Sequence, residues 1–199
     1  MIKVETRVIS NLDFWCVGVL QLVRNPAGYI HEYSHTVPGC VAKNHYADGP
    51  FCQFSLTSAP SVSGVYAVFI EDELRYIGEC VDLYRRFGPT GYGRISPRNC
   101  HDDGQSTNCK LNSRVLSEAK NGKRTIVWFY PTGDRKAIEA RLIFALNPPW
   151  NGRMESGLNS YRNDRNLAPY KHYAKSADSS GIPTTEDFRV ALIKILNNA

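Results

Sequence analysis

The chain has 199 residues, 42% of them hydrophobic and 22% charged, which suits a globular protein with one extended domain or two small ones. No apolar run approaches the roughly 20 residues of a membrane span, and the opening residues MIKVET lack the order of a secretory signal, so we expect a cytoplasmic protein without a membrane partner. The net charge is +5, and residues 75–124 carry ten basic and five acidic residues, a bias that favours a polyanionic partner.

Residues 1–60 are predicted to form a β-rich N-terminal extension. Phe14–Val23 is a strand candidate, residues 25–28 (NPAG) predict a turn, and Tyr29–Tyr33 is expected to pair back onto the first strand. The Ser-rich stretch 57–63 is the expected join to the next domain. A DNA clamp and a structural cover are both open as roles for this extension.

The six cysteines predict neither a disulfide framework nor a zinc site. None of them forms a Cys-x-x-Cys pair, and the sequence begins without a secretory signal. The cluster of His31, His35, Cys40 and His45 follows no common zinc-ligand spacing. We therefore expect most of the cysteines to be small buried residues.

Residues 61–153 are predicted to form a small, partly antiparallel β-sheet flanked by helices, an α+β fold. Gly64–Ile70 and Leu74–Ile77 are expected to form a hairpin around a polar turn at 71–73. A short helix at 82–87 is expected to precede an irregular stretch at 88–108 that is rich in Gly, Pro and Asn.

The second half of this domain is predicted to alternate helix, strand and helix. Asn108 is expected to cap a helix from about Lys110 to Lys120 that ends at Gly122, and residues 125–130 should form a buried strand. Asp134 should cap a further helix with a core stripe of Ile138, Leu142 and Leu146. Residues 154–199 form a C-terminal extension that ends in an amphipathic helix after Thr184.

Two tyrosines on the predicted hairpin, Tyr66 and Tyr76, are the first candidate functional residues. They lie ten residues apart in the tripeptides Gly64-Val65-Tyr66 and Tyr76-Ile77-Gly78, and strand alternation allows both phenols to stand on one hairpin. Ordinary cross-strand packing would explain the pair equally well. The basic segment directly downstream, which contains Arg86, favours instead a site for a phosphate group.

Five positions in this order resemble the GIY-YIG nuclease superfamily. Arg86 lies ten residues after the second tyrosine, Glu139 is on a later helix, and Asn151 lies twelve residues beyond Glu139. The resemblance covers about residues 63–153 and implies a Mg²⁺-dependent DNA endonuclease, such as a stand-alone restriction or defence enzyme. Mn²⁺ is expected to substitute for Mg²⁺, and no small-molecule cofactor is expected.

The resemblance also implies a role for each matched residue. Glu139 would hold the metal ion, since Mg²⁺ prefers oxygen ligands and needs few from the protein, and Arg86 would contact the scissile phosphate. Tyr66 is the candidate general base and Tyr76 would position the same water, although the sequence does not settle which phenol takes the proton. Asn151 either orders the end of the site or is a turn residue after Pro148-Pro149.

One position departs from the superfamily pattern. Where the family has a His or Tyr four residues after the arginine, this chain has Thr90, so Tyr92 and His101 are both candidates for the missing group. The longer stretch that follows, 91–109, mixes residue types that contact bases or phosphates. The expected contacts with double-stranded DNA, in this stretch and nearby, are Arg85, Arg94, Arg98, Lys110 and Arg114.

Three functions fit these residues. A restriction-like endonuclease, cutting both strands most simply as a homodimer, is the first expectation. A structure-specific or repair nickase would use the same site. A nucleic-acid-binding module with an inactive nuclease fold is the third, and the joint presence of Tyr66, Tyr76, Arg86 and Glu139 argues against it.

Overall fold

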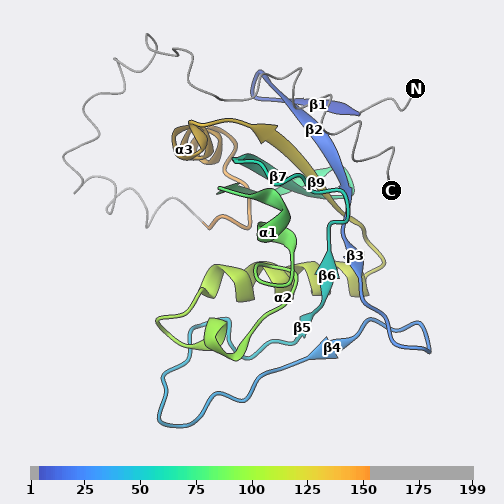
Figure 1. Ribbon diagram of the computed structural model, residues 1–199, viewed down its shortest axis with the longest axis vertical. Helices are drawn as coiled ribbons and strands as arrows, with labels where there is room; N and C mark the ends of the chain where they lie inside the picture. Colours follow the sequence, from blue (N-terminus) through green and yellow to red (C-terminus); the bar gives the residue numbers. More distant parts are fainter. Residues whose placement is uncertain (1–4, 153–199) are drawn as a thin grey trace, which may run out of the picture.

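The computed structural model describes residues 5–152, and the predicted C-terminal helix lies outside this part of the chain. The fold is α+β, as the sequence predicts, with a five-stranded antiparallel sheet in the order β1-β2-β9-β7-β8 (Figure 1). These strands are β1 (Thr6–Ile9), β2 (Leu12–Val19), β7 (Gly64–Ile70), β8 (Glu73–Cys80) and β9 (Thr125–Pro131).

Short strands and four helical segments complete the described fold. Strand β3 (Gln21–Leu22) pairs with β6 (Phe54–Ser55), and β4 (Glu32–Tyr33) pairs with β5 (Phe51–Cys52). The helices are α1 (Leu83–Phe87), the 3-10 helix η1 (Pro97–Cys100), α2 (Ser106–Lys120) and α3 (Arg135–Leu146). Within residues 5–152, no helix combines the length and apolar character needed to cross a membrane.

Strand β7 is fully buried, because β9 and β8 pair with its two edges and a hydrophobic core covers each of its faces. Val65, Ala67 and Phe69 face one hydrophobic core, and the alternate residues Tyr66 and Val68 face the other. Two separate cores therefore form, one on each side of the sheet, and Tyr66 belongs to the core of its own face rather than to an exposed hairpin.

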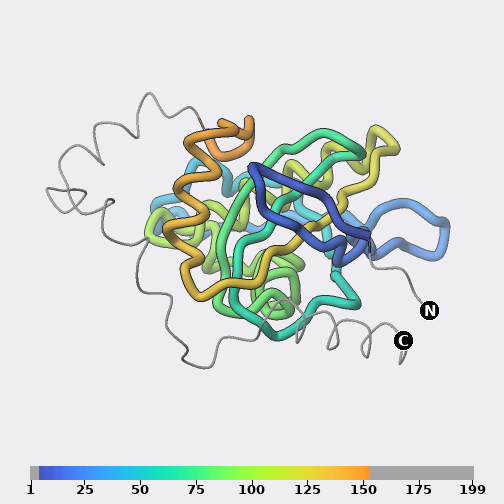
Figure 2. Tube along the Cα trace, turned by 90° about the horizontal axis from the view of Figure 1, so that it is seen from above, coloured from blue at the N-terminus to red at the C-terminus, as the bar shows by residue number. Residues whose placement is uncertain are grey.

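The helices divide between these two faces. Leu142 of α3 packs with the core that contains Val65, whereas Leu83 of α1 and Leu111 of α2 pack with the core that contains Tyr66. In Figure 1, α1 and α2 accordingly lie below the sheet and α3 lies to its left, and in Figure 2 α3 lies to one side and the β1–β2 hairpin to the other. Strand β8, at the edge of the sheet, is thus flanked by helices of both layers.

The N-terminal extension shares the main sheet, because β2 pairs with β9 along Trp15 to Val19. The prediction of one strand over Phe14–Val23 is wrong in extent. The pairing shifts register between Cys16 and Gly18, where Gly18 adopts a φ of 141°, and the chain then leaves the sheet to form β3.

The predicted partner strand Tyr29–Tyr33 is also largely wrong. Only Ile30 pairs back, in an isolated bridge with Arg24. Glu32 and Tyr33 instead form β4 and pair with β5, a strand eighteen residues further along the chain. The pairing of Tyr29–Tyr33 was predicted from the turn residues just before it. Pairing between strands that are far apart in the sequence involves no such turn, so the sequence did not indicate it.

Two helix predictions need correction. Helix α2 begins at Ser106, after Gln105, and Asn108 is a buried residue of its first turn whose Nδ2 donates to Gln105 Oε1 at 2.7 Å, so Asn108 is not the cap. The segment 88–108 is therefore not wholly irregular, since it contains η1 as well. Leu146 does not belong to the core stripe of α3, because it lies at the end of the helix and is 38% exposed.

Candidate functional site

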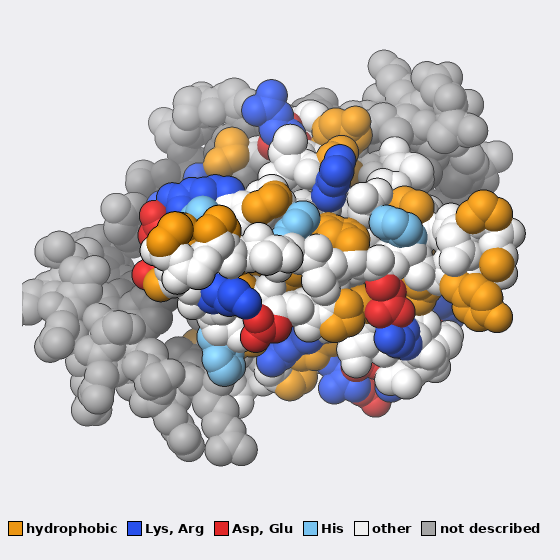
Figure 3. All heavy atoms as spheres, turned by 90° about the horizontal axis from the view of Figure 1, so that it is seen from below, with side chains coloured by type: hydrophobic (Ala, Val, Ile, Leu, Met, Phe, Trp, Pro, Cys, Tyr) orange, Lys and Arg blue, Asp and Glu red, His pale blue; other side chains and the backbone are white. Residues whose placement is uncertain are grey.

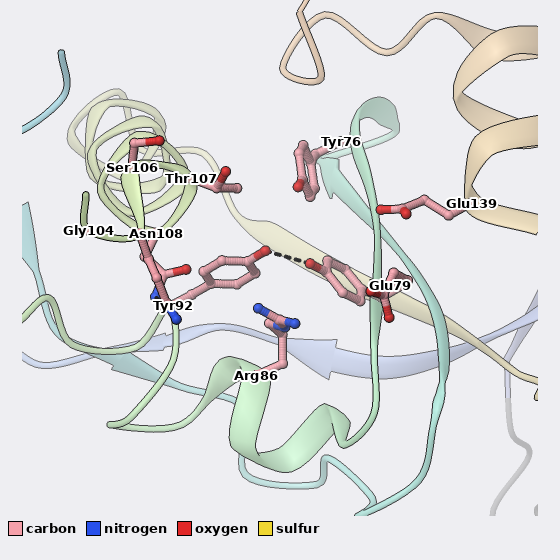
Figure 4. A pocket seen from close by; sticks show the side chains of 11 residues that line it. Tyr76, Glu79, Arg86, Tyr92, Gly104, Ser106, Thr107, Asn108 and Glu139 are labelled. Atoms are coloured by element: carbon pink, nitrogen blue, oxygen red, sulfur yellow. Dashed lines mark hydrogen bonds between the residues drawn. The ribbon is translucent and has the colours of Figure 1, made fainter. Parts of the chain in front are cut away.

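The candidate site is a pocket of about 350 Å³ between the hairpin, α1, the N-terminus of α2 and α3 (Figure 4). Four of the residues predicted from sequence line it together, namely Tyr66, Tyr76, Arg86 and Glu139, and Tyr92 lines it as well. These residues are spread over 74 positions of the sequence, so the fold, and not local sequence, brings them together. The remaining lining residues are Glu79, Gly104, Gln105, Ser106, Thr107 and Asn108.

The hairpin register places the two tyrosines side by side. Tyr66 lies opposite Gly78 and Tyr76 lies opposite Val68, and the two ring centroids are 6.2 Å apart. A Cβ atom at position 78 would lie 2.3 Å from the Tyr66 hydroxyl oxygen. Glycine at position 78 is therefore required for the Tyr66 phenol to lie across β8 and reach the pocket.

Tyr92 supplies a third phenol to the pocket. Its hydroxyl lies 2.6 Å from the Tyr66 hydroxyl, and its backbone N–H donates to the Arg86 carbonyl at 2.8 Å. Of the two groups that could replace the missing family residue, Tyr92 therefore lies in the pocket. His101 is not among the lining residues, and its Nδ1 lies 3.0 Å from Arg98 Nη1.

Arg86 places a positive charge beside these phenols. Its guanidinium carbon lies 5.5 Å from the centre of the Tyr92 ring, and the side chain is half-buried. Within residues 5–152 it forms no ion pair with a carboxylate, whereas neighbouring Arg85 pairs with Asp82 at 3.8 Å. Because the guanidinium is directed into the pocket (Figure 4), its donors are available to an anionic ligand.

Glu139 reaches the pocket from α3, on the other side of β8 (Figure 4). Burial and the nearby Glu79 carboxylate raise the pKa of Glu139 to about 7, although hydrogen bonding to the Glu79 backbone and the charges of Arg86 and Arg135 oppose this rise. Arg135 Nη1 donates to Glu79 Oε2 at 2.6 Å and holds that second carboxylate in place. Arg135 thus places a positive charge on the acidic side of the pocket, while burial still disfavours the carboxylate form of Glu139.

All three phenols are protonated near neutral pH. Burial raises the pKa of Tyr66 and of Tyr76 well above the ordinary value, and burial also raises the pKa of Tyr92. The Arg86 charge acts in the opposite direction on all three phenols. Tyr92 is also the phenol beside whose ring the Arg86 guanidinium carbon lies, at 5.5 Å from the ring centre.

Asn151 lies outside the pocket and acts on the backbone of β8. Its Oδ1 accepts from the Ile77 N–H at 2.9 Å and its Nδ2 donates to the Ile77 carbonyl at 2.7 Å. Ile77 is the residue between Tyr76 and Gly78, so Asn151 braces the strand that carries the second tyrosine. The contact is with the backbone of β8, so the role of Asn151 in ordering the end of a site stays a prediction.

The predicted DNA contacts lie around the pocket but do not line it. Arg98 pairs with Asp103, whereas Lys110 and Arg114 stack near the rings of Tyr46 and Trp150 at 5.9 and 5.8 Å. Arg85 and Arg94 are exposed. On the face seen from below, Lys and Arg side chains are interspersed with His and hydrophobic groups and do not form one continuous basic patch (Figure 3).

Sequence reasoning missed the polar residues at the start of α2 and the acidic partner of Glu139. Glu79 directly follows Tyr76-Ile77-Gly78, so its position beside the motif was a usable signal. Gln105, Ser106 and Thr107 had no such sequence signal, because no neighbouring residue indicates that the N-terminus of α2 lines the pocket. Asn112 was missed too, and its three hydrogen bonds are described below.

Within residues 5–152, no group of three or more His, Cys, Asp or Glu side chains gathers in a way that could hold a metal ion. The carboxylates of Glu139 and Glu79 lie on one side of the pocket, and Ser106 and Thr107 lie on the opposite side (Figure 4). Two carboxylates suit a hard cation that keeps most of its water ligands. Comparison of the chain with protein-family models, curated proteins and solved structures finds no match.

Proposed function

We propose that this chain is a divalent-metal-dependent nuclease that hydrolyses phosphodiester bonds in DNA, in keeping with its resemblance to the GIY-YIG superfamily. The proposal is carried by one observation: the guanidinium of Arg86, which has no carboxylate partner within residues 5–152, and the carboxylate of Glu139 line the same pocket, with three phenols beside them. A phosphodiester with an accompanying dication would match both charges, because the phosphoryl oxygens suit Arg86 and the cation suits Glu139.

Arg86 would bind the non-bridging oxygens of the scissile phosphate. Its lack of a carboxylate partner among residues 5–152 means that no ion pair must be broken before a phosphate binds. As charge develops on the phosphoryl group during hydrolysis, the fixed guanidinium stabilises it without reorganising. The half-buried position strengthens this interaction, because the surroundings screen charge less than bulk water does.

Glu139 would hold the metal ion, with Glu79 contributing negative charge beside it. The residues present fit Mg²⁺, since the carboxylates of Glu139 and Glu79 both line the pocket and offer hard oxygen ligands. When bound, Mg²⁺ supplies charge neutralisation and a lowered pKa for water. Arg135 keeps Glu79 oriented through its 2.6 Å hydrogen bond.

The phenols would hold the attacking water and move its proton. Tyr92 is the proposed proton acceptor, because its hydroxyl lies 2.6 Å from the Tyr66 hydroxyl and the Arg86 guanidinium lies beside its ring. Tyr66, the general base expected from sequence, is buried and 1% exposed, which suits a donor that stabilises the Tyr92 phenolate. Tyr76 would orient the water from the side of Glu139.

A plasmid-nicking assay with purified protein tests the proposal. Mg²⁺ or Mn²⁺ should convert supercoiled plasmid to nicked or linear DNA, and EDTA should stop the reaction. Glu139→Gln and Arg86→Ala should each lower the rate by 10²-fold or more, whereas Lys136→Ala, an exposed position on the same helix as Glu139, should cut like wild type. DNA binding without nicking under all of these metals would reject the nuclease and favour the binding module.

A further inference from the structure

Asn112, a residue of α2, makes three hydrogen bonds although it is completely buried. Its Oδ1 accepts from the Cys52 N–H at 2.9 Å, and its Nδ2 donates to the Cys52 carbonyl at 2.9 Å and to the Tyr92 carbonyl at 2.8 Å. One side-chain amide thus joins three separate segments, namely β5 of the N-terminal extension, helix α2 and the loop that carries Tyr92.

The backbone of Tyr92 is therefore fixed on both sides. Its N–H donates to the carbonyl of Arg86 at 2.8 Å, and its carbonyl accepts from Asn112 at 2.8 Å. The next residue, Gly93, is held in the same way, since its carbonyl accepts from the Phe54 N–H at 3.0 Å. The extension thereby supports the Tyr92 loop at two successive peptides.

We infer that Asn112 is a positioning residue that sets the location of the Tyr92 hydroxyl, and that β5 and β6 of the extension are the support against which it acts. This inference rests on the proposed nuclease function for its catalytic consequence. It also assigns a role to β5 and β6 of the extension: they support the loop that carries Tyr92 and do not clamp DNA.

Geometry explains why the loop needs this support. The segment 88–93 contains three glycines and lacks helix or strand structure, so its own conformational preferences do not fix Tyr92. A shift of about 1 Å in a catalytic group can cost about 10²-fold in rate. Shortening Asn112 would release the Tyr92 carbonyl and leave the buried peptide groups of Cys52 without partners.

A double-mutant cycle separates positioning from general support of the fold. Asn112→Ser should lower the single-turnover cleavage rate about 10–100-fold. When Tyr92 is already Phe, the same change should lower the rate less than about twofold further, because the hydroxyl that Asn112 positions is gone. If Asn112→Ser lowers the cleavage rate by the same factor with and without the Tyr92 hydroxyl, the inference is overturned. Asn44→Ser is the matched control, since Asn44 Nδ2 donates to the carbonyls of Asn99 and His101, away from Tyr92.

A second readout does not depend on cleavage. In protein labelled with 3-fluorotyrosine, the Tyr92 resonance is identified by its loss in Tyr92→Phe, and it should shift in Asn112→Ser but not in Asn44→Ser. An unmoved resonance would overturn the inference even if the protein is an active nuclease, and a moved resonance would support the positioning even if no cleavage is found. Should Asn112→Ser not fold, Asn112→Asp retains the shape and the acceptor for Cys52 but loses both donors.

Discussion

The side-chain amide of Asn151 pairs with both backbone groups of Ile77, as a neighbouring strand would, through bonds of 2.9 and 2.7 Å. Two residues earlier on β8, the Arg75 carbonyl accepts from the Trp150 N–H at 2.8 Å. The chain after α3 therefore closes the outer edge of β8, which would otherwise be a free sheet edge. Tyr76 lies between these two braced residues, next to the point where the pairing of β7 with β8 shifts register.

Asn151→Ala should destabilise the fold by about 1–3 kcal/mol, because it leaves the N–H and carbonyl of Ile77 without partners in a part-buried place. Chemical denaturation measures the loss, and faster hydrogen exchange at the Ile77 amide would locate it. Asn121→Ala is the control, since Asn121 is exposed and ends α2 without such a side-chain contact. Unchanged protection of the Ile77 amide would contradict the bracing role.

Gly78→Ala should cost about 1–3 kcal/mol in stability, because the added Cβ would lie 2.3 Å from the Tyr66 hydroxyl oxygen and one of the two must move. Displacing that phenol breaks its 2.6 Å contact with Tyr92, so cleavage should fall as well. Gly39→Ala is the matched control, since nothing lies within 4 Å of its added Cβ, and it should stay within about 0.5 kcal/mol of wild type. Equal stabilities of the two variants would reject the steric argument.

Much of this arrangement followed from sequence because its signals are local or strictly periodic. The apolar run 64–70 predicted a buried strand, and Gly122, with a φ of 75°, ends α2 as expected. The resemblance to the GIY-YIG superfamily, in which Arg86 and Glu139 are matched positions, predicted that they share a site, and both line the pocket. The partner of β4 was missed because β5 is distant in sequence. The cap at Asn108 was wrong for a local reason, because α2 starts earlier and Asn108 lies in its first turn.

The hydrogen bonds of Asn112 show a second limit of the sequence. The sequence does not distinguish a buried asparagine from an exposed one. Asn112 is linked to Tyr92 and Cys52 only because β5 packs against α2 in the folded protein. The same holds for Glu79, whose importance depends on Arg135 and Glu139 arriving from α3. Residues that act through contacts between distant segments have no periodicity to reveal them.

Glu139→Gln should make the metal-free protein more stable at pH 8 and leave it nearly unchanged at pH 4. The folded-state pKa of Glu139 is raised to about 7, so the folded state binds the proton more tightly, and the stability this contributes is present below pH 4.5 and is lost as the pH rises to about 7. After allowance for solvent screening, the gain at pH 8 should be roughly 1–2 kcal/mol.

Denaturation in EDTA at both pH values measures this difference. Glu71→Gln is a control of opposite sign, because hydrogen bonds from Arg124 lower the pKa of Glu71. That variant should lose stability at pH 8 and approach wild type as the pH falls below the ordinary range for a carboxyl group. A Glu139→Gln protein that is less stable than wild type at pH 8 would show that the carboxylate is already compensated in the metal-free fold.

Mg²⁺ should stabilise the wild-type protein at pH 8, because a dication relieves the repulsion between Glu139 and Glu79. A concentration one hundred times the dissociation constant should add about 2.7 kcal/mol to the free energy of unfolding. The gain should shrink at pH 5.5, where protonated Glu139 competes with the metal, and it should be small in Glu139→Gln at either pH. Thermal melts with and without Mg²⁺ test this without DNA, so a metal site can be recognised even in a protein that does not cut. Equal stabilisation of wild type and Glu139→Gln would place the metal elsewhere on the chain, and the carboxylate pair would then need Arg135 and Arg86 alone for its neutralisation.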